Sequence, residues 1–258
     1  MRKKAEMAGG RRIVITGASK GIGAKTAALL LASGYSIVAT ARGESALRDL
    51  YGNEKNAEAI PWDLSDPARI GDYAKTVKEA VGPVAGLIHC AGIEKTFPIH
   101  ITKPAKIEEV FNINTYAAML LVSGFSKKGM TEDTASFVLI SSLAAHEGVR
   151  GHAVYAASKA ALEGFARAAA PELAEKGIRI NCIAPGTVET EMTAAYRSQL
   201  TESQDRAFSA GYPLGIGTAH DIAAFAKYLV SEEAKWLTGQ TYILDGGHLA
   251  RGAEAGPE

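Results

Sequence analysis

"TGASKGIGAKT", residues 16–26, decides the fold, because glycines stand at 17, 21 and 23 directly after the β-rich run "RIVIT" (12–16). The spacing is Gly-x-x-x-Gly-x-Gly, and a helical pattern opens near Gly21. Gly17 permits a tight turn, Gly21 lets a phosphate approach the backbone, and Gly23 lets the helix pack close to a sheet. The amides at the start of that helix would face the anion. The stretch therefore predicts a dinucleotide-binding turn.

Two alternatives compete with this prediction. "GAKT" resembles the ending of an NTPase phosphate loop, but that loop needs glycine directly before the lysine, and Ala24 occupies the place. The glycines could also form a merely structural turn. The alternation of strands and helices that follows favours the dinucleotide site.

Short apolar runs recur along the chain, separated by longer helical patterns, notably over 105–128, 154–176 and 219–231. The strand-like runs after the first are "SIVATA" (36–41), "AEAIPW" (57–62), "VAGLIH" (84–89), "SFVLIS" (136–141), "IRINCIA" (178–184) and "TYILD" (241–245). Near-continuous apolar strands between helices predict a parallel sheet covered on both faces, and right-handed crossovers make it a doubly wound α/β fold.

One domain over residues 1–258 is expected, because a chain of this length buries a substantial single core. The region 187–218 shows no strand pattern, and a loop of that size predicts a substrate lid. The tails 1–10 and 251–258 are expected to be flexible.

Composition excludes several classes of function. Lysine plus arginine and aspartate plus glutamate both number 28, so the neutral chain carries no electrostatic footprint for nucleic acid or an anionic membrane. No apolar run is long enough to span a bilayer, and no signal-peptide core follows the basic start. Two cysteines predict buried thiols in a reducing compartment, hence the cytoplasm. "HEGVR" (146–150) lacks the second histidine of a zinc motif, and no metal site is predicted.

The end of the second predicted strand indicates which cofactor binds. An acidic residue there would bind the ribose hydroxyl of NAD, but "ATARGES" has Ala41 at that place and Arg42 beside it. Arg42 can grip a 2′-phosphate, and Lys20 can add a second cation, so we favour NADP over NAD. Solvated surface charges are the alternative reading, and Glu44 is the dissenting feature. Asp63, after the third strand, suits either an adenine amine or an ordinary turn.

Tyr155 and Lys159 in "YAASK" share one helix face, as residues four apart do. Tyr51 and Lys55 have the same separation, so spacing alone does not identify a site. Ser142 distinguishes the two pairs. It ends the preceding strand, thirteen residues before Tyr155, whereas no serine stands at the same offset before Tyr51.

Together these elements resemble the short-chain dehydrogenase/reductase family. The matching motifs are "TGASKGIG", "AG" in "CAGI", "NIN", "ISS", "YAASK", "APGTVETEM" and "TGQTYILDGG", in the family's order over residues 12–247. The resemblance implies a Rossmann-like fold with seven parallel strands and an NAD or NADP cofactor. It also implies a catalytic tetrad of Asn114, Ser142, Tyr155 and Lys159. Asn114 is preferred to Asn112 by the family pattern.

The resemblance assigns a role to each of these residues. Tyr155 would protonate the alkoxide left by hydride transfer, Lys159 would lower its pKa, Ser142 would hold the substrate oxygen, and Asn114 would hold a proton-relaying water. The cofactor-binding set comprises Gly17, Ser19, Lys20, Gly21, Ile22, Gly23, Arg42, Asp63, Leu64, Ala91, Gly92, Tyr155, Lys159, Pro185, Gly186, Val188 and Thr190. Cys90 departs from the family's asparagine, and altered local hydrogen bonding is expected, with a reactive thiol disfavoured.

The leading prediction is NADPH-dependent reduction of a carbonyl, or the reverse oxidation, similar to 3-oxoacyl-carrier-protein reductases. Lys127 and Lys128 are candidates for docking an acidic carrier protein, with a solvated helix end as the alternative. A reductase of small ketones, sugars or steroids is the alternative enzyme, its pocket set by residues such as Tyr196, Phe208 and Tyr212. A non-catalytic NADP-binding regulator is a remote alternative. The alanine-rich helix 154–176 predicts a homo-oligomer, a tetramer or a dimer.

Overall fold

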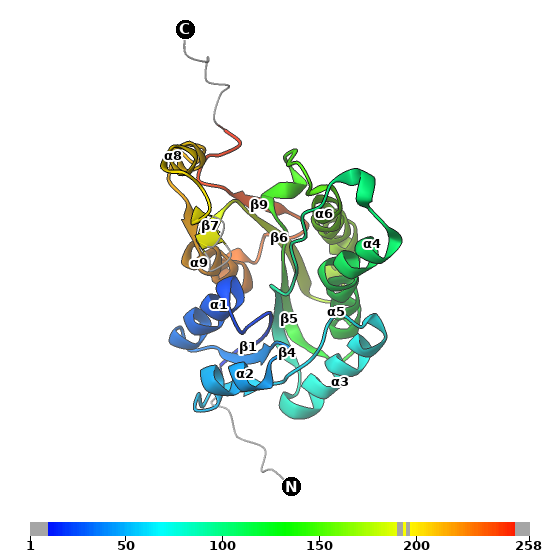
Figure 1. Ribbon diagram of the computed structural model, residues 1–258. Helices are drawn as coiled ribbons and strands as arrows, with labels where there is room; N and C mark the ends of the chain where they lie inside the picture. The colour runs from blue at the N-terminus through cyan, green and yellow to red at the C-terminus, as the bar shows by residue number, and fades with distance from the viewer. Residues whose placement is uncertain (1–9, 190–192, 195–196, 251–258) are drawn as a thin grey trace.

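The computed structural model describes residues 10–189, 193–194 and 197–250, so the tails 1–9 and 251–258 and Thr190 and Tyr196 lie outside the described residues. Seven parallel strands form one sheet in the order β3-β2-β1-β4-β5-β6-β9 (Figure 1). They are β1 (Arg12–Thr16), β2 (Ser36–Thr40), β3 (Ala57–Ala59), β4 (Val84–His89), β5 (Thr131–Ile140), β6 (Ile178–Pro185) and β9 (Thr241–Leu244). The order reverses beside β1, which confirms the predicted doubly wound sheet.

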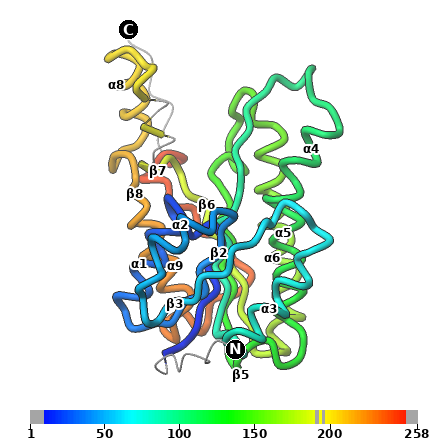
Figure 2. The backbone as a smooth tube through the Cα atoms, turned by 60° about the horizontal axis from the view of Figure 1, so that its bottom comes forward, coloured from blue at the N-terminus to red at the C-terminus, as the bar shows by residue number. Residues whose placement is uncertain are grey.

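Helices cover both faces of the sheet (Figure 2). Their bounds are α1 (Gly21–Ala32), α2 (Glu44–Tyr51), α3 (Ile70–Val81), α4 (Pro104–Phe111), α5 (Ala117–Phe125), α6 (Ala153–Ala174), α8 (Glu202–Ala210) and α9 (Ala219–Val230). Alternate residues of one strand enter different cores: Val14 packs with α3, α5 and α6, whereas Ile13 and Ile15 pack with α1, α2 and α9. This alternation explains why the strands read as continuous apolar runs.

Two segments differ from the predictions. The helix expected over 105–128 is interrupted by a π-helical turn, Asn112–Tyr116, between α4 and α5. The region 187–218 was expected to lack strands, but it contains β7 (Val188–Glu189) and β8 (Gly217–Thr218), which pair in parallel. Two-residue strands carry no periodicity that a sequence reading could detect.

Among the described residues, no helix is long and apolar enough to cross a membrane. The carboxyl ends of the parallel strands and the loops that follow them form one edge of the sheet, and the residues predicted to act lie there.

Candidate functional site

The glycine turn between β1 and α1 is crowded enough to require glycine. Gly17 has a φ of +66°, and a Cβ there would lie 2.9 Å from the Ala91 nitrogen. A Cβ at Gly23 would lie 2.3 Å from the Gly17 carbonyl oxygen, so the helix could not approach the turn. Ala18 N–H donates to the Thr40 carbonyl across 3.0 Å. This cradle, which a side chain would fill, fits the phosphates of a dinucleotide.

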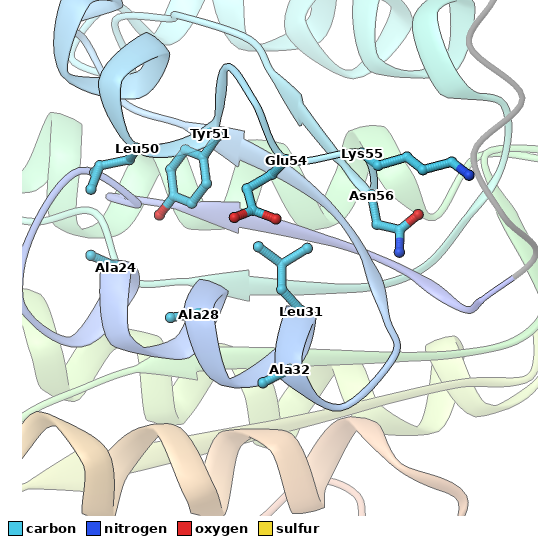
Figure 3. A pocket seen from close by; sticks show the side chains of 9 residues that line it. All are labelled: Ala24, Ala28, Leu31, Ala32, Leu50, Tyr51, Glu54, Lys55 and Asn56. Carbon is cyan, nitrogen blue, oxygen red and sulfur yellow. The ribbon is translucent and has the colours of Figure 1, made fainter.

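Tyr51, which has the same spacing to Lys55 as Tyr155 has to Lys159, supports the glycine turn through a hydrogen bond. Its hydroxyl donates to the Ala18 carbonyl across 2.7 Å, and burial raises its pKa to about 12. Lys55 follows the end of α2, and Figure 3 shows the two side chains pointing in different directions. They line a pocket of about 450 Å³ between α1 and the α2–β3 connection. Tyr51 is therefore structural.

The proposed adenine end carries exposed cations. Lys20 and Arg42 are exposed, and Arg42 has no recorded ion pair within the described part of the chain. Glu44 instead pairs with Arg48 one helical turn away, Oε1 to Nη2, at 2.6 Å. Glu44, the residue that favoured NAD, is therefore paired with Arg48.

Asp63 behaves as a turn residue. Its Oδ1 accepts from the Ser65 amide at 2.9 Å and from the Ser65 hydroxyl at 2.8 Å. These bonds lower the pKa of the carboxyl, with a smaller contribution from the Arg42 charge. Leu64 beside it is buried.

The remaining predicted cofactor-binding residues lie in the turn after β1, after β4 and at the end of β6. Ser19 and Ile22 belong to the turn and the first turn of α1, Ala91 and Gly92 follow β4, and Pro185 ends β6. A Cβ at Gly92 would lie 3.0 Å from Asn114 Oδ1 and 3.3 Å from Lys159 Nζ. Gly186 donates to the Leu244 carbonyl, and Val188 is buried in β7. Thr190 lies outside the described residues.

Tyr155 and Ser142 meet at the carboxyl edge of β5. Ser142 caps the short 3₁₀ helix Leu143–Ala145, where its Oγ accepts from the Ala144 amide at 3.2 Å, and its hydroxyl is close enough to Tyr155 to act on the pKa of that phenol. Ser141 has a different environment, since its Oγ lies 2.6 Å from Glu163 Oε1 and 3.1 Å from the Lys159 carbonyl oxygen, and it can donate its one proton to either. This geometry supports the choice of Ser142.

Lys159 is almost fully buried, at 5% exposure, one helical turn after Tyr155. Its ammonium donates to the Ile140 carbonyl across 2.8 Å and lies 5.9 Å from the centroid of the Tyr155 ring. Burial lowers the pKa of Lys159 to about 8, against smaller opposing contributions from Cys90, Cys182 and Glu94. A group poised near neutrality suits proton transfer.

Lys159 was expected to lower the pKa of Tyr155, but in the protein alone this pKa is raised. Burial raises it to about 12; the Ser142 hydrogen bond acts in the lowering direction, and the Glu94 charge adds to the rise. The physical reason is that desolvation outweighs a lysine that donates to a carbonyl. Tyr155 is therefore held as the phenol, the form that can donate a proton.

Asn114 lies in the π-helical turn and is fully buried. Its Oδ1 accepts from Ile93 N–H at 2.8 Å, and its Nδ2 donates to the Ile93 carbonyl at 2.9 Å and to Ser158 Oγ at 3.0 Å. Ser158 in turn donates to the Tyr155 carbonyl. The amide thus fastens the loop segment at Ile93 to α6, and single π-helical turns often mark functional sites.

His89 and Cys90 fill the end of β4. His89 is fully buried, with Nδ1 2.9 Å from Thr16 Oγ1. Thr16 Oγ1 also accepts from Ala91 N–H at 3.2 Å, so this hydroxyl links the end of β1 to the residues that follow β4. Burial raises the pKa of the Cys90 thiol to about 12, so a reactive thiol is not supported.

Burial, with help from the Lys159 charge, lowers the pKa of His89 to about 3. An unfolded histidine titrates near 6.5, so between these values the unfolded chain binds the extra proton, and stability falls as the pH drops below about 6.5. We expect His89→Asn to remove about 2 kcal/mol of the loss in unfolding free energy between pH 7 and pH 5, measured by urea unfolding. His100→Asn, at an exposed histidine, is the control. An unchanged acid loss in His89→Asn contradicts the prediction.

A carboxylate–imidazole pair at the mouth of the site escaped the sequence analysis. His152 Nε2 lies 3.2 Å from Glu94 Oε1 and 3.0 Å from Thr96 Oγ1, and its ring meets the Tyr155 ring edge to face at 5.8 Å. Phe97 N–H also donates to the Gly151 carbonyl. The loop after β4 is thereby fastened to the loop that precedes α6. A glutamate directly after "AGI" was the signal available in the sequence.

Lys127 and Lys128 do not join the site. They lie between α5 and β5, at the amino end of the strand whose carboxyl end leads to Ser142. Ten residues of β5 separate the two edges by about 30 Å. The two lysines are therefore misplaced for a carrier protein that serves Tyr155. Within the described ranges, no cluster of histidine, cysteine, aspartate and glutamate could hold a metal ion.

Comparisons with known proteins show what the chain is similar to. A family model described as enoyl-(acyl carrier protein) reductase matches residues 17–248. The chain is 32% identical over 242 residues to the 3-oxoacyl-[acyl-carrier-protein] reductase FabG of Escherichia coli K12, covering 92% of this chain and 97% of that protein. It resembles the structure of a short-chain type dehydrogenase/reductase from Mycobacterium ulcerans, with a TM-score of 0.85, 28% identity, and 93% and 90% of the two chains covered. It also resembles an actinorhodin polyketide ketoreductase solved with NADPH, with a TM-score of 0.85 and 28% identity. The match covers 93% of this chain and 97% of that one.

Proposed function

Because the chain belongs to the short-chain dehydrogenase/reductase family and is an oxidoreductase of that family, we propose that it reduces a carbonyl to an alcohol with NADPH, or runs the reverse oxidation, with Tyr155 as proton donor. The observation that carries the proposal is the meeting of Ser142 and Tyr155 above a buried Lys159 at the carboxyl edge of β5. The FabG and ketoreductase similarities support it.

The chain's own residues divide the work of reduction. When bound, the nicotinamide supplies the hydride. Ser142 donates a hydrogen bond to the substrate oxygen and holds it beside Tyr155, which improves both orientation and charge stabilisation. Tyr155 gives its proton to the oxygen as negative charge develops there. Lys159, whose ammonium lies 5.9 Å from the centroid of the Tyr155 ring and whose pKa is lowered to about 8, can restore that proton.

The choice of NADPH rests on Arg42 and Lys20. A phosphate on the adenosine ribose would gain charge-assisted hydrogen bonds from the guanidinium, and Arg42 needs no partner to be broken first. A neutral ribose hydroxyl would gain much less, and Glu44, which could bind it, is paired with Arg48.

We expect Arg42→Ala to lower kcat/KM for NADPH by about 10- to 100-fold, the effect of losing a hydrogen bond to a charged group. The kcat/KM for NADH should stay the same, because no phosphate is involved. Lys75→Ala, at a lysine of α3 that is 70% exposed, is the control for loss of a surface cation. Equal losses with both cofactors would contradict the assignment.

The substrate proposal is a 3-oxoacyl thioester, on the strength of the similarity to FabG. Docking of a carrier protein through Lys127 and Lys128 is not part of it. The test is oxidation of NADPH and NADH by purified protein over a panel containing a 3-oxoacyl thioester, small ketones, sugars and steroids. A best rate with the thioester supports the proposal, and a best rate elsewhere replaces the substrate class. Binding of NADPH without turnover of any carbonyl would favour the NADP-binding regulator.

We also propose that the chain forms a homo-oligomer through α6. Ala153, Ala157, Ala160 and Ala168 of this helix are exposed in the isolated chain, so two helices could approach closely. Light scattering tests the proposal, since a monomeric mass would reject it.

A further inference from the structure

His248, just after β9, lies where two segments that border the site meet. Its Nε2 is 3.0 Å from Glu147 Oε2, and Glu147 belongs to the loop between Ser142 and Tyr155. Its Nδ1 is 2.7 Å from the Gly211 carbonyl oxygen. Its ring stacks on Tyr212, with centroids 4.6 Å apart and planes 28° apart. Glu147 and Tyr212 are 65 positions apart in the chain, and His248 touches both.

The partners of His248 determine its protonation state. A carbonyl oxygen and a carboxylate can only accept hydrogen bonds, whereas a neutral imidazole has one N–H to give. Both contacts are satisfied together when both ring nitrogens carry a proton. The charged groups around the ring agree: Glu147 faces it from the loop, and Asp245 lies on its own segment, where it accepts from the Gly247 and Leu249 amides. The stacked Tyr212 ring also favours a cation.

Tyr212 connects His248 to the backbone beside Gly186, one of the predicted cofactor-binding residues. Its hydroxyl lies 2.5 Å from Thr187 Oγ1 and accepts from Thr187 N–H at 3.3 Å. A Cβ at Gly186 would lie 3.3 Å from the Tyr212 ring. The ring is therefore held between His248 and the Gly186–Thr187 backbone. The ring of Phe208 in α8 also packs against the Tyr212 ring, with the two ring centroids 6.1 Å apart.

We propose that His248, as an imidazolium, is a positioning residue that fastens the Glu147 loop to the turn at Gly211 and Tyr212 and, through Tyr212, to the Gly186–Thr187 backbone. The proposal rests on the proposed function, because the substrate that this contact helps to bind is the one reduced at Tyr155. Without the second N–H, either Glu147 or the Gly211 carbonyl loses its donor. The turn at Gly211 and Tyr212 then loosens, substrate binding weakens, and the chemical step at Tyr155 is unaffected.

Steady-state kinetics of the wild type and the His248 variants at one pH test this. His248→Gln should raise KM for the carbonyl about tenfold over the wild type while kcat for reduction stays the same, as loss of one charge-assisted bond predicts. His248→Arg, which keeps a permanent charge and several N–H donors, should keep the KM of the wild type. His220→Gln, at an exposed histidine, is the control.

Amide hydrogen exchange separates this proposal from the proposed function. Exchange over residues 208–217, corrected for intrinsic rates, should be faster in His248→Gln than in the wild type at about pH 6. Faster exchange without turnover of any carbonyl upholds the positioning role and rejects the proposed function. Turnover with unchanged exchange, and with the same KM in the wild type and in His248→Gln, overturns the positioning role. A His248→Gln protein that changes kcat alone overturns it as well.

Discussion

Replacing Tyr155 by phenylalanine is expected to lower kcat for carbonyl reduction by about 10²- to 10⁴-fold, the usual contribution of a positioned general acid. The hydroxyl lies near Ser142, and burial holds it in the protonated state with a pKa of about 12. The ring itself packs edge to face on His152. Phenylalanine preserves that packing, so the fold and the affinity for NADPH should be unchanged.

Stopped-flow single-turnover reduction and fluorescence titration with NADPH measure the two quantities separately. Tyr116→Phe, at a tyrosine that is 47% exposed on the π-helical turn, is the control for loss of a phenol. A Tyr155→Phe enzyme that retains most of its rate would remove Tyr155 as the proton donor. A loss that comes entirely from weaker NADPH binding would assign Tyr155 to the cofactor alone.

Replacing Lys159 by methionine is expected to reduce kcat by about 10²-fold or more while stabilising the folded protein. The pKa of this lysine falls from 10.5 to about 8 on folding, so the unfolded chain binds more protons between those values. Stability therefore rises with pH from about 8 to 10.5, and below that window the folded protein carries the whole cost of a buried charge, about 3 kcal/mol. Methionine fills a similar volume without the charge, but gives up the bond to the Ile140 carbonyl.

Urea unfolding at pH 7, beside the activity assay, measures both effects. The free energy of unfolding should rise by about 1–2 kcal/mol, after about 1 kcal/mol is subtracted for the lost hydrogen bond. Lys75→Met, at a lysine that is 70% exposed on α3, should change neither quantity. A strongly destabilised Lys159→Met protein would mean that the ammonium is structural rather than functional.

The predictable parts of the molecule were those carried by local patterns. The glycines at 17, 21 and 23 and the pair Tyr155 and Lys159 lie within short stretches, and the parallel, doubly wound sheet follows from a repeated strand–helix unit. The bounds of β1 and β4 were right to the residue. The polar start of β5, Thr131–Ala135, was missed because its register shifts against β4 and its side chains are largely exposed.

The parts that were not predictable depend on contacts between distant residues. Glu147 and His248 are 101 positions apart, and Glu94 and His152 are 58 apart, so no spacing rule joins either pair. The direction of the Tyr155 pKa depends on burial, which no motif encodes. The roles of the tetrad remain predictions that the proposed variants test.

Strand β9 covers the edge of β6 but is synthesised about 60 residues after it. It is the last strand of the described sheet to leave the ribosome, yet it pairs along β6 from Cys182 to Pro185. Until residues 241–248 emerge, a nascent chain already holds Tyr155 and Lys159 but exposes the open edge of β6, which can pair with another chain. Ribosome-bound chains that end before residue 241 should therefore depend on chaperones, and the dependence should end once β9 is free to pair.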